Sequence, residues 1–144
     1  GYFDLIISIY ALGWSANLNH TFAHIARYLK PHGRLIFSWE HPIHQCVSYE
    51  AGQFVVKRSY QVEEPRMAEA WNEATVVKYP RKLSTFINAM LNAGLRLDRL
   101  IEPAVAPQFV QVEHDDPHAW YSVARASLVP TTFIVCASKP IGME

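Results

Sequence analysis

The stretch that decides the fold runs from Phe3 to Glu40 and reads FDLIISIYALGWSANLNHTFAHIARYLKPHGRLIFSWE. Phe3–Ile9 is apolar except for Asp4 and Ser8, and an apolar run of this length predicts a strand buried on both faces. Arg34–Trp39 has the same character and predicts a second buried strand. Strands of this kind are typical of a parallel sheet.

A helix is predicted between these two strands. The apolar positions of the intervening stretch recur at helical spacing, at Leu18, Phe22, Ile25 and Leu29. Either Asn17 or Asn19 suits the N-cap position. We expect the helix to stop at Lys30-Pro31, because the residue before a proline disfavours helical backbone, and Gly33 to complete a turn. Strand, helix and strand then form one right-handed crossover unit.

Segment 44–80 breaks this alternation with aromatic residues, charges and short β-rich pieces. We interpret it as an insertion, or cap, over the mouth of the sheet. Phe54–Val62 and Glu73–Tyr79 are candidate strands that are expected to pair antiparallel, separated by Glu63-Glu64-Pro65. Long irregular segments of this kind often close over a substrate. A surface excursion without a catalytic part is the alternative.

A second helix and two further strands are predicted after this insertion. The helix is indicated by apolar residues at Leu83, Phe86, Ile87, Met90 and Leu91. Ala93-Gly94 ends it, since glycine readily takes the left-handed backbone of a helix C-terminus. Leu95–Ile101 alternates as a strand near a sheet edge does, and Thr131–Ser138 is the last clear strand. Between them the pattern indicates only a turn at 114–118 and a short helix within 119–130.

Length and composition favour one domain over residues 1–144. Half of the 144 residues are hydrophobic, which is enough for a single core. Lys plus Arg and Asp plus Glu are balanced at 13 each, so no excess charge indicates nucleic acid or a membrane surface as a partner. Cys46 and Cys136 are too few for a disulfide framework, and Cys136 is expected to be a buried thiol. A reducing, cytoplasmic setting fits this composition.

Several phrases resemble a known family. FDLIIS, then AL.W, then ARYLKPHGRLIFSWEHP resemble the fourth and fifth strands of class I S-adenosylmethionine-dependent methyltransferases of the small-molecule type. In LKPHGRL, His32 stands where that family usually has a glycine, and VVKYPRKLSTFINAMLNAGLRLDRLIEP resembles its next helix and sixth strand. The resemblance implies a Rossmann-like sheet of order 4-5-7-6 in the family's numbering, with Thr131–Ser138 antiparallel. It also implies S-adenosylmethionine as the cofactor and a small-molecule substrate.

The resemblance covers only the later part of that fold. The family's glycine-rich loop after a first strand and its acidic residue ending a second strand have no counterpart in this sequence, and Gly1 stands almost directly before the first predicted strand. We therefore interpret the chain as the C-terminal part of a longer enzyme, inactive by itself and binding the cofactor weakly or not at all. The open edge of the first strand is expected to pair with a second copy and to form a homodimer, with coverage by another segment as the alternative.

Ligands of doubly wound sheets bind outside the carboxyl ends of the strands. The resemblance places Ser8, Tyr10 and Ala11 beside the methionine and sulfonium part of the cofactor. The ring of Tyr10 or Trp14 is a candidate to face the sulfonium by cation–π attraction, which contributes roughly 0.5–2 kcal/mol. Packing of both rings between helix and sheet is the alternative.

Glu40 and His41, followed by Pro42, are the candidate catalytic residues. Methyl transfer is an in-line displacement, so the protein has to align the acceptor and exclude water. A hydroxyl or protonated amine acceptor also needs a base, and an imidazole with an ordinary pKa of about 6.5 suits neutral pH. For His41, a plain loop role is the alternative.

Trp14, Tyr79 and Arg81 are the candidate substrate-binding residues, and the last two lie where the insertion returns to the second helix. The family often has a histidine between such a tyrosine and arginine, and Pro80 removes that possible base. Arg81 suits an acidic group on the substrate, with a solvated helix start as the alternative. The sequence HDDPH at 114–118 resembles metal ligands only superficially, and without a second cluster we expect an exposed turn and no metal.

Two other classes of protein stay open. One is a non-catalytic binding or regulatory module derived from a methyltransferase fold. The other is a different nucleotide-binding α/β enzyme, for example an oxidoreductase, whose sheet would end in a parallel strand where the methyltransferase resemblance requires an antiparallel one.

Overall fold

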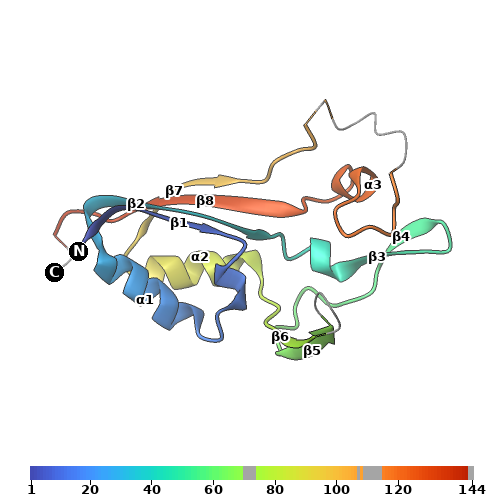
Figure 1. Cartoon of the computed structure of the whole chain (residues 1–144), viewed down its shortest axis with the longest axis horizontal. Helices are drawn as coiled ribbons and strands as arrows, with labels where there is room; N and C mark the ends of the chain where they lie inside the picture. The colour runs from blue at the N-terminus through green and yellow to red at the C-terminus, as the bar shows by residue number, and fades with distance from the viewer. Residues whose placement is uncertain (70–73, 107, 109–114, 143–144) are drawn as a thin grey trace.

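The computed structural model describes residues 1–69, 74–106, 108 and 115–142 of the chain. Its main sheet has four strands in the order β1 (Phe3–Ile9), β2 (Leu29–Glu40), β8 (Thr132–Ser138) and β7 (Arg96–Ile101). β1 and β2 are parallel, as the sequence predicts for this pair, and β8 is antiparallel to both β2 and β7 (Figure 1). The sheet is therefore mixed, with its one antiparallel strand between β2 and β7.

Helices α1 (Leu18–Tyr28) and α2 (Leu83–Asn92) lie on the same face of this sheet (Figure 1). Alternate side chains of β2 and β8 point toward them and form the core with residues of both helices: Leu35, Phe37, Phe133, Val135, Phe22 and Phe86. Burial of each large apolar side chain contributes about 1.5–3 kcal/mol, so this layer supplies most of the hydrophobic stabilisation. None of the helices within the described ranges is long and apolar enough to span a membrane.

The opposite face of the sheet is open at β1. Leu5, Ile7 and Ile9 are 47%, 57% and 73% exposed, so the prediction that this strand is buried on both faces is wrong. Cys136, which follows the same face across the sheet beside Ile36, is only half-buried. The physical reason is that an apolar run identifies a strand but does not show whether one or two layers cover it.

The turn between α1 and β2 differs from the prediction. Asn17 is the N-cap, and its side chain accepts the His20 N–H at 3.0 Å. The helix ends at Tyr28, and the Lys-Pro-His-Gly segment already belongs to β2, with His32 at φ +63°. The His32 N–H donates to the Lys139 carbonyl at 2.9 Å. A contact with the chain after β8 therefore replaces the local turn that Pro31 and Gly33 predict.

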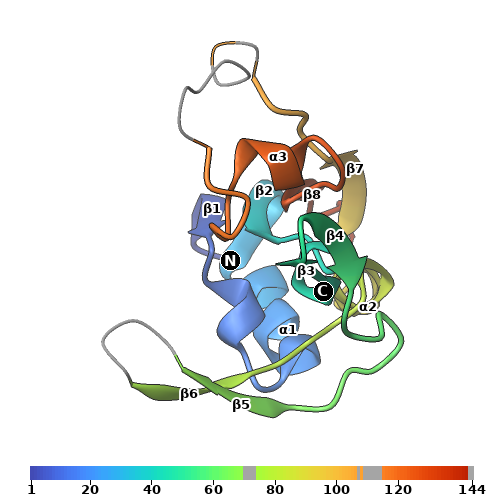
Figure 2. The same ribbon diagram turned by 90° about the vertical axis from the view of Figure 1, so that its right-hand side faces the viewer.

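The insertion forms two local hairpins, and the expected pairing between Phe54–Val62 and Glu73–Tyr79 is wrong. β3 (Val47–Glu50) pairs with β4 (Gln53–Val56) through a turn at Ala51 and Gly52, whose φ angles of +48° and +82° suit a tight two-residue hairpin. β5 (Arg66–Glu69) pairs with β6 (Thr75–Lys78). Figure 2 shows the second hairpin well apart from the first, which lies near α3 (Val123–Ala126).

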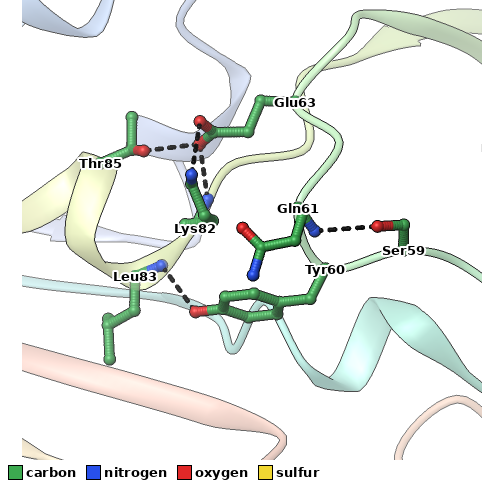
Figure 3. Close-up of polar contacts among 7 residues, drawn as sticks. All are labelled: Ser59, Tyr60, Gln61, Glu63, Lys82, Leu83 and Thr85. Atoms are coloured by element: carbon green, nitrogen blue, oxygen red, sulfur yellow. Dashed lines mark hydrogen bonds and ion pairs between the residues drawn. The ribbon is translucent and has the colours of Figure 1, made fainter.

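The loop before β5 is fixed to the first turn of α2 by side chains. The Glu63 carboxylate accepts the Lys82 N–H at 2.7 Å and the Thr85 hydroxyl at 2.6 Å, and the Tyr60 hydroxyl accepts the Leu83 N–H at 3.1 Å (Figure 3). The first N–H groups of a helix have no intrahelical partner, and a carboxylate is favoured beside them. Glu63 therefore caps α2 from 19 residues earlier in the chain.

Replacing Glu63 by alanine is expected to lower the free energy of unfolding by about 1–2 kcal/mol, because the Lys82 N–H and the Thr85 hydroxyl lose their acceptor. Urea denaturation at neutral pH measures this loss. Glu64→Ala, which changes the exposed neighbouring carboxylate, is the matched control and is expected to stay within about 0.5 kcal/mol of the unaltered protein. Equal losses for the two variants would contradict the capping role of Glu63.

Candidate functional site

The carboxyl ends of β1 and β2 meet because the two strands are parallel. Tyr10, directly after β1, donates its N–H to the Ser38 carbonyl at 3.1 Å and has a φ of +51°. Left-handed backbone is uncommon for a non-glycine residue and is concentrated at functional sites. The ring lies 5.9 Å from Trp39 and 6.2 Å from Tyr121, between centroids, and its hydroxyl contacts that of Thr132.

The two other candidate cofactor residues flank Tyr10. The Ser8 hydroxyl is buried and has no hydrogen-bond partner among the residues that the structure describes. Buried polar groups are normally satisfied, so this unpaired hydroxyl is an exception within the described residues. Ala11 is exposed, and its carbonyl accepts the Trp14 N–H at 3.1 Å in the 3-10 turn η1 (Leu12–Trp14). Ala11 thus leaves open surface next to Tyr10 in the chain, whereas the Ser8 hydroxyl does not reach the surface.

Glu40, the last residue of β2, is held by three neutral donors. Its carboxylate accepts the Gln45 amide at 3.0 Å, the Trp120 indole N–H at 3.2 Å and the Tyr121 hydroxyl at 3.5 Å. Within the described ranges, no lysine or arginine lies at ion-pair distance from this carboxylate. Glu40 is therefore a positioned, half-buried anion next to the strand end.

His41 is buried, and both of its ring nitrogens are bonded. Nε2 lies 2.8 Å from the Glu102 carboxylate, and Nδ1 accepts the Ile43 N–H at 3.2 Å. Because Nδ1 accepts, the neutral ring carries its proton on Nε2 and donates it to Glu102. Burial lowers the pKa of His41, and Glu102 partly offsets that effect. To act as a base, His41 has to give up one of these two hydrogen bonds.

Arg81 extends from the start of α2 to the loop between β1 and α1. Its guanidinium donates to the carbonyls of Gly13 at 3.1 Å, Ser15, and Ala16 at 3.4 Å, and lies 5.2 Å from the centroid of the Tyr79 ring. These donors are occupied by the protein, so in this conformation Arg81 positions the loop and does not face an acidic ligand group with a free fork.

Three candidates from distant segments line one small gap: Trp14, Glu40 and Tyr79. The gap holds about 10 Å³, roughly the space for one water. The Trp14 ring packs edge-on against Trp39 at 5.6 Å, and a side chain at Gly13 would overlap the Trp39 indole. The structure thus brings the predicted aromatic residues together around a closely packed indole.

His44 and the region after residue 115 form a buried cluster that the sequence pattern does not reveal. His44 is fully buried and stacked on Tyr121 at 5.3 Å, with Trp120 at 4.3 Å, and neither ring nitrogen has a partner within the described part of the chain. Arg125 is also buried and donates to the Val47 carbonyl at 2.5 Å. The one local signal is an arginine in a short, otherwise apolar helix next to two aromatic residues.

The HDDPH sequence forms a turn and a helix cap where it is described. Both Asp115 oxygens accept backbone N–H groups at the start of α3, from Val123 at 2.8 Å and Ala124 at 2.7 Å. Asp116 accepts the His118 N–H at 2.9 Å. His114 lies outside the described residues. The described residues contain no group of three or more side chains placed to hold a metal ion.

Comparison with known proteins points to one family. Residues 1–37, which contain β1, α1 and most of β2, match the family described as a methyltransferase domain. An S-adenosylmethionine-dependent methyltransferase from Mesorhizobium loti is 25% identical, with a TM-score of 0.74 over 96% of this chain and 62% of its own. A protein from Listeria monocytogenes assigned to the same class is 26% identical, with a TM-score of 0.74 over 94% of this chain and 61% of its own.

A sequence relative gives a similar picture of coverage. An uncharacterized protein of Haemophilus influenzae is 28% identical over 115 residues, which is 74% of this chain and 45% of that protein. The chain thus spans less than half of that relative and less than two thirds of the two solved structures. Together these similarities support an S-adenosylmethionine-dependent methyltransferase family for this α/β fold.

Burial lowers the pKa of His44 from 6.5 to about 4, with the charge of Arg125 as the next cause. Between these pH values the unfolded chain binds more protons at His44 than the folded chain does. The stability that the neutral, buried His44 allows is therefore complete above pH 6.5, and the free energy of unfolding falls as the pH falls toward 4. The full difference corresponds to roughly 3 kcal/mol. The unpartnered nitrogens of His44 add a further cost that an apolar ring would not have.

His44→Phe is therefore expected to be more stable than the unaltered protein at pH 4.5, by about 2 kcal/mol more than at pH 7.5. Urea denaturation at the two pH values measures the change. His118→Gln, at an exposed histidine, is the control and is expected to leave the pH dependence unchanged. Parallel pH profiles for His44→Phe and the unaltered protein would rule out this account of His44.

Proposed function

We propose that the chain is the later part of a class I S-adenosylmethionine-dependent methyltransferase of the small-molecule type. The observation that carries the proposal is the parallel β1-α1-β2 unit, most of which lies in the matched residues 1–37 and which brings Tyr10 and Glu40 to one edge of the sheet. In the family's numbering, β1, β2, β8 and β7 correspond to strands 4, 5, 7 and 6. The antiparallel β8 supports this assignment over a nucleotide-binding oxidoreductase with an all-parallel sheet end.

The residues around Tyr10 fit the methionine and sulfonium end of S-adenosylmethionine. The Ser8 hydroxyl is buried without a described partner, Ala11 is exposed, and Trp14 presents 38% of its surface. A cation beside the Tyr10 or Trp14 ring gains cation–π attraction. When bound, the cofactor supplies an electrophilic methyl group. We propose that this chain alone binds it weakly, with further cofactor contacts in the rest of the protein.

We propose that Glu40 and His41 act on the methyl acceptor. Glu40 is fixed by Gln45, Trp120 and Tyr121, so its carboxylate can orient a hydroxyl or amine donor without moving. His41 becomes a base when Nδ1 releases the Ile43 N–H, while Nε2 stays bonded to Glu102. Trp14 and Tyr79 line the approach to Glu40, and Arg81 holds the loop that carries Trp14.

Calorimetric titration of the full-length protein with S-adenosylmethionine and S-adenosylhomocysteine tests this function. Both are expected to bind, because the two molecules share every part except the transferred methyl group. Absence of binding by both would remove the support for methyl transfer and favour a non-catalytic module derived from this fold.

Tyr10→Ala in the full-length protein is expected to weaken S-adenosylmethionine binding by about 2- to 30-fold, the equivalent of the cation–π contribution. S-adenosylhomocysteine is expected to be less affected, because its thioether carries no positive charge. Tyr28→Ala, at a partly exposed tyrosine of α1, is the matched control and is expected to change neither affinity. Equal losses for both molecules would show that Tyr10 serves packing and does not face the sulfonium.

We also propose that the free edge of β1 joins two copies in a homodimer. The strand exposes Phe3, Leu5, Ile7 and Ile9, and unpaired edge strands readily pair with another chain. Light scattering is expected to give twice the 16.4 kDa mass of the chain, and Ile7→Lys is expected to give a monomer. A monomer before any substitution would contradict this arrangement, and Leu128→Lys, at an exposed leucine outside the sheet, is the control.

A further inference from the structure

A larger cavity opens beside the small gap, between the turn after β2 and the insertion. Its volume is about 330 Å³, within the range of small-molecule sites. Three guanidinium groups, those of Arg58, Arg66 and Arg81, line it together with one carboxylate, that of Glu64. We call this space the arginine cavity. Positive groups outnumber negative ones on its wall, so the cavity favours an anion.

Arg66 of β5 has an incomplete set of partners. Its Nε is buried and, among the residues that the structure describes, has no hydrogen-bond acceptor. Leaving such a donor unsatisfied costs about 1–3 kcal/mol. Burial lowers the pKa of Arg66, and the nearby charge of Arg58 lowers it further. An anion in the cavity would remove both costs, because it would accept from Nε and separate the two like charges.

Arg58 and Arg81 differ in how many of their guanidinium donors are already bonded to the protein. Arg58 is exposed, and its one side-chain hydrogen bond in the described part of the chain is a long one of 3.4 Å to the Gln45 carbonyl. Arg81 instead donates to the carbonyls of the β1–α1 loop. Glu64 forms no ion pair with these arginines within the described ranges. Arg58 and Arg66 are therefore the two cations with donors left for a ligand.

The arginine cavity adjoins the candidate catalytic residues. Pro42, which follows Glu40-His41 in the chain, lines it, and so does Gln45, whose amide donates to Glu40 at 3.0 Å. Glu40 is also close enough to raise the pKa of Arg66 against the effect of burial. A ligand with its charged group at the arginines can thus reach toward Glu40.

We propose that the arginine cavity binds the methyl acceptor through a carboxylate or phosphate group held by Arg58 and Arg66. The proposal rests on the methyltransferase function above and names the chemical class of its substrate. Guanidinium groups bind both oxyanions through paired, charge-assisted hydrogen bonds. Val62, Pro65 and Pro80 supply apolar wall for the remainder of the molecule. The acceptor is therefore a small anion with a compact apolar body.

The proposal is tested by titrating the protein with benzoate, phenyl phosphate and benzamide. The NMR signals of the arginine Nε–H groups report binding. At least one of the two anions is expected to shift the Arg58 and Arg66 signals to saturation. Its affinity is expected to be at least ten times that of benzamide, the neutral counterpart. Preference for benzoate identifies a carboxylate acceptor, and preference for phenyl phosphate identifies a phosphate. Equal binding of benzamide, or no saturable shift with either anion, would overturn the proposal.

Two variants and a control locate the binding. Arg66→Gln and Arg58→Gln are each expected to weaken binding of the preferred anion by at least tenfold. Arg58 lies on an exposed loop, so its variant is expected to fold even if Arg66→Gln does not. Arg27→Gln, at an arginine that is exposed like Arg58 but lies on α1 away from the cavity wall, is expected to change binding by less than twofold. Undiminished binding in Arg58→Gln would overturn the assignment.

The titration contains no S-adenosylmethionine, so its outcome is separate from that of the proposed function. Cofactor binding by the full-length protein without anion selectivity would overturn only the class of acceptor. Anion selectivity at Arg58 and Arg66 without cofactor binding would instead support the site and overturn methyl transfer.

Discussion

Parallel pairing of β1 with β2 is the constraint on which the rest of the structure depends. Because the two strands run in the same direction, their carboxyl ends meet, and Tyr10 and Glu40 lie at the same edge of the sheet. α1 forms the crossover between the two strands and contributes Phe22 to the core. β8 pairs antiparallel with β2 and places Thr132 next to the Tyr10 hydroxyl. The backbone ladder, more than any single side chain, thus sets the geometry of the site.

The insertion is attached to this frame by polar side chains. Glu63 and Tyr60 satisfy the first turn of α2, and Arg81 bonds to the carbonyls after β1. Contacts of this type depend on individual hydrogen bonds, each worth about 0.5–1.5 kcal/mol, and not on a shared apolar core. The walls of the arginine cavity therefore rest on a few named interactions, and the sheet below them is stabilised independently.

Local pattern predicts the elements of the main sheet and both long helices, because apolar period and capping residues are properties of neighbouring residues. Pairing in the insertion was not predictable in the same way: the Ala51-Gly52 turn decides it, and alanine is no signal for left-handed backbone. The approach of Trp14 to Glu40 follows from strand order, which the resemblance supplies, whereas Tyr79 reaches them from the end of the insertion. The bond from His41 to Glu102 spans 61 residues and leaves no trace in local spacing. The arginine cavity also joins residues that are distant in the sequence, so local spacing does not reveal it.

One consequence follows from the double position of Arg81, which lines the arginine cavity and donates to Gly13 and Ser15. An anion that draws this guanidinium toward itself competes with the two carbonyls and alters the freedom of the segment that bears Trp14. By thermodynamic linkage, whatever orders that segment changes the affinity of the anion by the same factor. A single side chain therefore joins the wall of the arginine cavity to the segment after β1, and a change in the free energy of one would be felt equally by the other.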